Sequence, residues 1–89
     1  MPMSRLQIDA PLQPHEAFGQ VVRARRAELE ISQEELGARC GLDRTYVSGI
    51  ERGTRNPTIQ SMWRIAKGLG SPLSDLLRQV ERRVRRSQK

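Results

Sequence analysis

The chain contains few of the residues from which metal centres, disulfides and catalytic sites are built. Its 89 residues include one cysteine and one histidine. Cys40 therefore has no partner for a disulfide within the chain, and with His15 as its companion it offers no zinc ligand set. We predict no metal and no cofactor, and we interpret Cys40 as a small buried apolar residue rather than a reactive thiol. An enzyme is not expected either, because no nucleophile and base arrangement can be assembled.

Long hydrophobic runs are also lacking. No stretch is apolar enough to span a bilayer, and the N-terminal MPMSRLQIDAPLQP has no apolar core of a secretory signal. We therefore expect a cytoplasmic protein with no membrane partner. A chain of 89 residues makes one small domain, so neither a deep substrate cleft nor a small-molecule ligand is expected.

Positive charge is in excess and is unevenly distributed. Lys and Arg number 16 against 10 acidic residues, for a net charge of +6. Residues 78–89 hold six basic residues and one acidic residue, so the chain before them is nearly neutral. A basic chain of this size favours an anionic partner, either nucleic acid or an acidic membrane surface. A solvated helix end is an equally good explanation of the basic tail.

Hydrophobic periodicity predicts an all-α protein of five helices, with no strand pattern and no repeat. Prolines 2, 11 and 14 mark residues 1–14 as a flexible arm. The first helix is expected from His15 to Glu30. The second helix should begin at a Ser32–Glu35 capping box and end at Gly41. The third should begin at an Asp43 cap and end at Arg52, before Gly53. The fourth should begin at a Thr58 cap and end at Gly68 or Gly70. The fourth carries Ile59, Met62, Ile65, Ala66 and Leu69 as apolar positions, and a fifth follows Pro72 with Leu73, Leu76, Leu77, Val80 and Val84.

The second and third predicted helices match the helix-turn-helix template. Counted from Gln33 as the first of twenty positions, apolar or small residues stand where the two helices must touch. Gly37 is fifth, where the helices cross closely, and Gly41 is ninth, where the turn requires a positive φ. The other matching residues are Leu36, Cys40, Leu42, Val47 and Ile50. The template explains why the weak helix formers of RTYVSG begin the third helix, since this end would enter the DNA major groove.

The segment from Gln33 to Ile59, QEELGARCGLDRTYVSGIERGTRNPTI, resembles the Cro/CI (XRE) family of helix-turn-helix regulators. It is most similar to the controller proteins of restriction-modification systems. The resemblance implies a five-helix, lambda-repressor-like fold, with residues 15–80 as the DNA-binding and dimerisation domain and residues 81–89 as a basic tail. It also implies a homodimer that regulates transcription on palindromic double-stranded operators. RNA polymerase is a candidate partner.

The resemblance also assigns roles to individual side chains, and these roles fit their chemistry. Gln33, at the start of the second helix, would bind a phosphate. Arg44, Thr45 and Ser48 would read bases, since arginine can fork onto guanine and threonine can meet a thymine methyl. The expected backbone contacts are Tyr46, Arg52, Arg55 and Asn56. Packing is the alternative for Tyr46, and a solvated helix end is the alternative for Arg52.

Other positions carry structural expectations. The resemblance also implies an ion pair between Arg26 and Glu51. Gly49 stands where relatives carry a base-reading glutamine, which predicts less direct readout or a close backbone approach to the groove. Glu30 stands where many members of this family have a glycine, and it would carry about 1 kcal/mol of strain if its backbone were left-handed. The dimer interface is expected at Trp63, Leu73, Leu76, Leu77 and Val80, unless this stripe closes the monomer core.

Two further functions are compatible with the sequence. An XRE-type antitoxin or protein-interaction module would use the same helices to hold a protein, and a generic phage-like repressor would share the DNA contacts. Arg44, Thr45 and the Arg55/Asn56 pair together favour DNA, because a protein binder would not need all of them.

Overall fold

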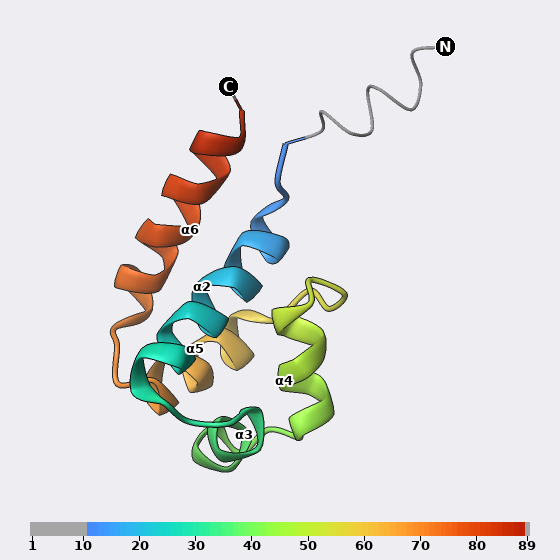
Figure 1. Ribbon diagram of the computed structural model, residues 1–89, viewed down its shortest axis with the longest axis vertical. Helices are drawn as coiled ribbons and strands as arrows, with labels where there is room; N and C mark the ends of the chain where they lie inside the picture. Colours follow the sequence, from blue (N-terminus) through green and yellow to red (C-terminus); the bar gives the residue numbers. More distant parts are fainter. Residues whose placement is uncertain (1–10, 89) are drawn as a thin grey trace.

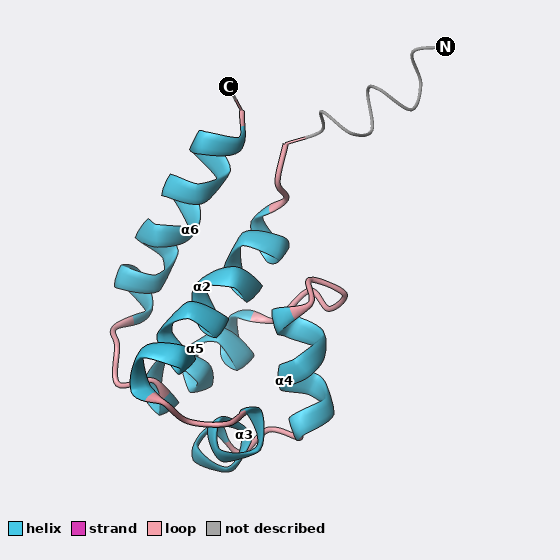
Figure 2. Cartoon of the chain, viewed as in Figure 1, coloured by secondary structure: helices cyan, strands magenta, loops and turns pink. Residues whose placement is uncertain are grey.

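The computed structural model describes residues 11–88, and this part of the chain contains five α-helices, which confirms the predicted all-α fold (Figures 1 and 2). The helices are α2 (Pro14–Leu29), α3 (Gln33–Cys40), α4 (Arg44–Glu51), α5 (Ile59–Gly68) and α6 (Leu73–Ser87). α2 packs against α4 and α6, α3 packs against α4 and α5, and α5 packs against α6. As Figure 1 shows, α4 and α6 lie at opposite edges of the molecule, with α2 between them.

Most helix ends follow local sequence signals. Ser32 and Thr58 cap α3 and α5, since each side-chain oxygen accepts a hydrogen bond of 3.0 Å from the backbone N–H three residues later. Two predicted caps differ. The Glu35 carboxylate pairs with Arg39 at 3.1 Å, one helical turn away, instead of closing a capping box. Asp43 precedes α4 but makes no side-chain cap, so α4 depends on its packing.

One apolar core fills the space between the helices. Its largest fully buried side chains are Phe18, Val21, Val22, Leu36, Val47, Ile50, Ile65, Leu69 and Leu76. Fully burying a side chain of this kind contributes about 1.5–3 kcal/mol. Four apolar positions of the helix-turn-helix template, Leu36, Cys40, Val47 and Ile50, are therefore core positions, and Leu42 is partly buried against them.

Glycine permits two close helix approaches. A Cβ added at Gly37 would lie 2.6 Å from the carbonyl oxygen of Leu42, so the fifth template position must be small. A Cβ added at Gly19 would overlap the carbonyl oxygen of Ile50. The main chain of α3 can therefore approach that of the turn at Leu42, and the main chain of α2 that of α4 at Ile50, only because these positions have no side chain.

The turn between α2 and α3 contains a strained residue. Glu30 adopts the left-handed conformation, with φ 57° and ψ 41°, and it is the one non-glycine residue with positive φ between residues 11 and 88. Its N–H donates to the carbonyl oxygen of Ala27 at 3.1 Å, which ends α2. The left-handed conformation anticipated for this departure from the family is present.

Replacing Glu30 with glycine is expected to raise the free energy of unfolding by about 0.5–1 kcal/mol, because glycine adopts this conformation without strain. Gly41 provides the reverse test. Its φ is 71° and an added Cβ would have nothing within 4 Å, so Gly41→Ala should lower stability by about 1 kcal/mol through the backbone alone. Urea denaturation measures both variants. Equal stability of Glu30→Gly and wild type would show that Glu30 is not strained.

α6 extends through the predicted basic tail. Ser87 Oγ accepts a hydrogen bond from the backbone N–H of Leu12 at 2.9 Å, and Leu12 and Val84 pack against the core. Residues 81–87 are thus helical and part of the domain, in contrast to the boundary predicted after residue 80. Leu12, which was assigned to the flexible arm, lies against this domain, and the part of the predicted arm before Pro11 lies outside the described residues.

Residues 11–88 contain no group of three or more His, Cys, Asp or Glu side chains that could hold a metal ion. Cys40 is buried, and burial raises the pKa of its thiol, although the charge of Arg39 acts in the opposite direction. None of the helices in this part of the chain combines the length and apolar character needed to cross a membrane.

Candidate DNA interface

α4 exposes its first residues and buries the opposite side. Arg44 and Thr45 are exposed and Ser48 is half-buried, whereas Val47 and Ile50 are fully buried. α3 and α4 are joined by a tight turn at Gly41, where φ is 71°. In a helix-turn-helix of this kind, the N-terminal end of the second helix contacts base edges in the major groove. Arg44 and Thr45 therefore lie where a groove can reach them, and Ser48 is less accessible.

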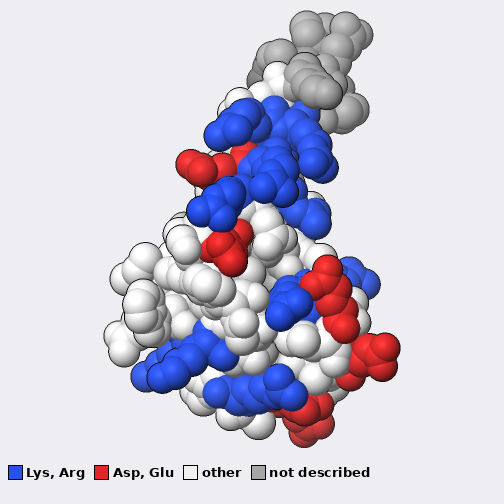
Figure 3. Space-filling view, turned by 90° about the vertical axis from the view of Figure 1, so that its left-hand side faces the viewer, with Lys and Arg blue, Asp and Glu red and all other residues white. Residues whose placement is uncertain are grey.

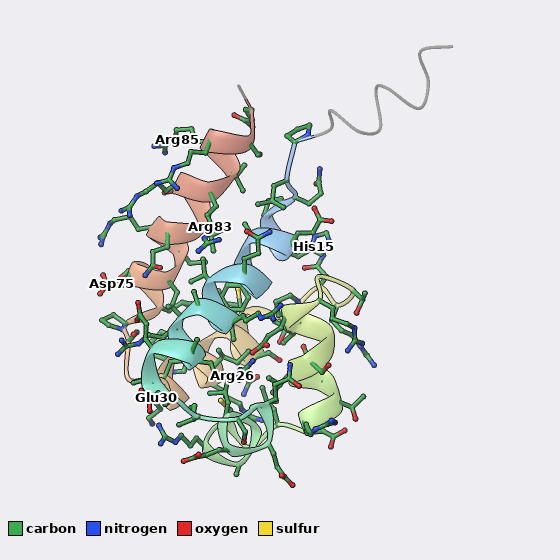
Figure 4. All side chains as sticks on the ribbon, viewed as in Figure 1. His15, Arg26, Glu30, Asp75, Arg83 and Arg85 are labelled. Carbon is green, nitrogen blue, oxygen red and sulfur yellow. The ribbon has the colours of Figure 1, made fainter. Side chains whose placement is uncertain are left out.

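A buried ion pair fixes the end of α4 to α2. Arg26 Nε and Nη2 donate to Glu51 Oε2 and Oε1 at 2.7 and 2.9 Å, and Arg26 Nη1 donates to the carbonyl oxygen of Ile31 at 2.9 Å. The Glu51 side chain is 3% exposed and that of Arg26 is 18% exposed. Hydrogen bonding to Glu51 raises the pKa of Arg26, and burial opposes this effect. Figure 4 shows Arg26 among the helices, and the pair is the one that the resemblance implies.

Gln33 extends this network. Its Nε2 donates to Glu51 Oε1 at 3.0 Å, whereas the prediction for this side chain was a DNA phosphate contact. The contact places the start of α3 beside the end of α4. A phosphate role for this end of α3 would therefore depend on the backbone N–H groups of the first helical turn, with the Gln33 side chain holding α3 against the ion pair.

Gly49 makes room for the side chain of Arg55. A Cβ added at Gly49 would lie 2.6 Å from Arg55 Cγ, and the Arg55 guanidinium carbon lies 5.7 Å from the centroid of the Tyr46 ring. Thr54 anchors the loop to the helix, because its N–H and Oγ1 both donate to the carbonyl oxygen of Gly49, at 2.9 and 3.1 Å. The space beside Gly49, where a close approach to the DNA groove was expected, is thus occupied by the loop of the same chain.

Three other predicted DNA contacts have partners within the protein. Tyr46 is half-buried against the core, and its hydroxyl donates to Ser61 Oγ at 3.2 Å, so the packing alternative is present in the structure. Arg52 Nη1 donates to Ser48 Oγ. To contact DNA, Ser48 and Arg52 would therefore have to give up this hydrogen bond with each other. No prediction from the sequence named Ser61 as the partner of the Tyr46 hydroxyl. Its position three residues after the Thr58 cap was the one local signal for this residue.

The predicted dimer stripe divides into core and surface. Leu76 is 0% exposed and Val80 is 6% exposed, so they are unavailable to a second chain, and that part of the prediction is corrected. Leu73 and Leu77 are half-buried and pack against the core, whereas Trp63 is 65% exposed. Ile59, one helical turn before Trp63 and one of the predicted apolar positions of this helix, is 66% exposed, whereas Ile65, Ala66 and Leu69 are buried in the core.

The turn at Gly41, the exposed start of α4 and the basic loop after it define a DNA-binding protein of the helix-turn-helix class. A helix-turn-helix family model matches residues 22–76. The chain belongs to the helix-turn-helix family.

Curated and solved relatives agree with this family. The control protein C.BamHI of Bacillus amyloliquefaciens is 49% identical over 61 residues, which are 67% of this chain and 75% of that protein. The structure of the restriction-modification controller protein C.AhdI from Aeromonas hydrophila has a TM-score of 0.68 at 39% identity, over 70% of this chain and 94% of that chain. The C.Esp1396I controller tetramer in complex with its natural 35-base-pair operator has a TM-score of 0.74 at 35% identity, over 80% of this chain and 93% of that chain. The predicted XRE-type fold and the similarity to controller proteins are confirmed.

Proposed function

We propose that the protein is a restriction-modification controller protein, a homodimeric regulator that binds palindromic operator DNA in the cytoplasm. The observation that carries this proposal is the composition of α4 and its loop. Arg44 and Thr45 are exposed at the start of the helix, and Arg55 and Asn56 are exposed in the loop after it. Candidate base readers and candidate phosphate contacts thus lie together on one helix and its following loop, and the similarity to controller proteins supports the same function.

Each part of this unit has a distinct task. Arg44 would donate two hydrogen bonds to guanine O6 and N7, and Thr45 would bind a neighbouring base through its hydroxyl or methyl group. Arg55, Asn56 and the first turn of α3 would bind phosphates and so fix the register of α4 in the groove. The resemblance implies binding at the promoter of the protein's own gene and at that of an endonuclease gene. Activation there would involve RNA polymerase as a partner.

Ile59 and Trp63 supply a surface for the second protomer. One recognition helix covers too few base pairs to define a site, so regulators of this size bind as twofold dimers. The two side chains are the large exposed apolar residues of the described chain, and tryptophan is enriched among interface anchors. We place the twofold interface on this surface of α5.

Trp63→Glu is expected to convert the dimer to monomers without loss of helical content, because the indole is 65% exposed and contributes little to the core. Sedimentation and far-UV circular dichroism measure the two properties. Gln79→Glu adds the same charge at an exposed position of α6 and should leave the dimer intact. Leu77→Glu should instead lower the melting temperature, because Leu77 packs against the core. A Trp63→Glu variant that remains dimeric would exclude α5 as the interface.

In vitro selection from a random duplex library tests the proposed function. We expect enrichment of inverted half-sites with centres about 10 bp apart or a multiple of this distance. The affinity for the selected duplex should fall steeply with salt, with a logarithmic slope of about −0.9 for each phosphate contacted. If no sequence is enriched and binding does not depend on salt, the protein is an interaction module and not a DNA-binding regulator.

A further inference from the structure

The outer face of α6 carries four arginines that the proposed function does not use. Arg78, Arg82, Arg85 and Arg86, here called the α6 arginine face, fall within an arc of about 100° on a helix of 3.6 residues per turn. The arc lies opposite the buried Leu76 and Val80. Basic side chains gather over this end of the molecule in Figure 3. In Figure 4, Arg85 points away from the bundle.

The protein holds this face in a fixed position. Ser87 Oγ accepts from the Leu12 N–H and donates to the carbonyl oxygen of Val84 at 2.7 Å. Arg83, on the side of α6 toward α2, donates from Nη1 to Gln20 Oε1 at 3.0 Å. The last turns of α6 are therefore part of the folded domain. Arginines carried by a folded helix lose less backbone conformational entropy on binding than those of a frayed tail would.

The four guanidinium groups retain most of their charge for a partner. Within residues 11–88, Arg78 is the one member of the face that forms an ion pair, with Asp75 at 3.0 Å, and both of these side chains are largely exposed. Such surface pairs contribute little and are readily exchanged. Arginine also suits phosphate recognition, since its planar guanidinium group can donate two parallel hydrogen bonds.

The surroundings of the face favour a polyanion over a protein or a membrane. The large exposed apolar residues of the described chain are Ile59 and Trp63, both on α5. A protein interface has an apolar centre, and an amphipathic helix at a membrane needs apolar side chains to insert. A phosphate backbone needs only positive charge, which is what this face provides.

The position of the face excludes the duplex that α4 would hold. α6 and α4 lie at opposite edges of the molecule (Figure 1), so DNA bound at α4 is on the far side from the α6 arginine face. We propose that the α6 arginine face is a second, sequence-independent DNA-binding surface, which binds the phosphates of a duplex other than the one at α4. A protein bound to an operator would then tether a second segment of DNA.

A first experiment isolates α6 by disabling α4. The variant Arg44→Ala/Arg55→Ala is titrated with a short labelled duplex of arbitrary sequence at low salt, and binding is followed by fluorescence anisotropy. Residual binding is expected, and adding Arg82→Gln/Arg86→Gln should weaken it about tenfold and reduce the salt slope by about two. Adding Arg39→Gln/Lys67→Gln removes the same charge from exposed positions on other helices and should change affinity less than about twofold. No difference between these two charge-removed proteins would overturn the proposal. This experiment uses a duplex of arbitrary sequence, so its outcome is independent of whether an operator is selected for the proposed function.

A second experiment tests tethering. Protein bound to the immobilised selected duplex is exposed to a labelled duplex of unrelated sequence. Wild type should capture the second duplex, and Arg82→Gln/Arg86→Gln should lose about tenfold of this capture while its operator affinity stays within about twofold. Circular dichroism confirms that the variant is folded. If wild type captures poly-glutamate but not the second duplex, the face binds an acidic protein and the proposal is wrong.

Discussion

Arg26→Ala is expected to lower the free energy of unfolding by about 3 to 5 kcal/mol, which is a large part of the stability of a small domain. The substitution leaves the Glu51 carboxylate, 3% exposed, without the two hydrogen bonds that it now accepts from Arg26. The Nε2 of Gln33 then remains as its side-chain donor. Urea or thermal unfolding, followed by circular dichroism, measures the loss.

Arg39→Ala is the matched control for the ion pair. Arg39 also pairs with a glutamate, Glu35, at 3.1 Å, but both side chains are about half exposed. Its loss should cost less than about 1 kcal/mol. The double variant Arg26→Met/Glu51→Leu should recover part of the loss, because it leaves no unpaired charge. Equal, small losses for Arg26→Ala and Arg39→Ala would show that burial does not strengthen this pair.

Arg44→Ala is expected to remove most of the discrimination between the selected operator and a random duplex. A bidentate contact to guanine contributes about 1 to 3 kcal/mol of discrimination, so two half-sites in a dimer contribute about 2 to 6 kcal/mol. The side chain is exposed at the start of α4 and lies outside the core, so unfolding should change by less than about 0.5 kcal/mol. Competition binding against both duplexes at one salt concentration gives the ratio.

Arg55→Ala provides the contrast to this result. As a phosphate contact, Arg55 should contribute equally on both duplexes, and its loss should reduce the salt slope by about one for each site. An Arg44→Ala variant that loses the same affinity on both duplexes would make Arg44 a phosphate contact. In that case base readout would have to come from Thr45 and Ser48.

The helix-turn-helix was predictable because its determinants are local. Gly37 and the apolar residues around it face a helix that begins only a few residues later. Their spacing in the sequence therefore indicates which of them share a helix face. The left-handed conformation of Glu30 could be considered beforehand only because many members of the resembling family have glycine at this position. The Ser32 and Thr58 caps need only the three residues that follow them.

The features that sequence reasoning missed depend on contacts between distant segments. The Gln33 side chain binds a carboxylate 18 residues away, and Leu12 meets Ser87 across 75 residues. No local pattern encodes either contact. The exposure of Ile59 was missed because helical periodicity gives the width of an apolar arc but not how far a neighbouring helix covers it.

Transplanting the operator preference of another XRE regulator by placing glutamine at position 49 would meet a steric obstacle. Any Cβ there would lie 2.6 Å from Arg55 Cγ, so the new side chain would displace Arg55 from its place beside Tyr46. The exchange would gain a base reader and disturb the backbone clamp in the same step. A change at position 49 is therefore coupled to the position of the Arg55 side chain, and a new specificity introduced in α4 would require a compensating adjustment in its loop.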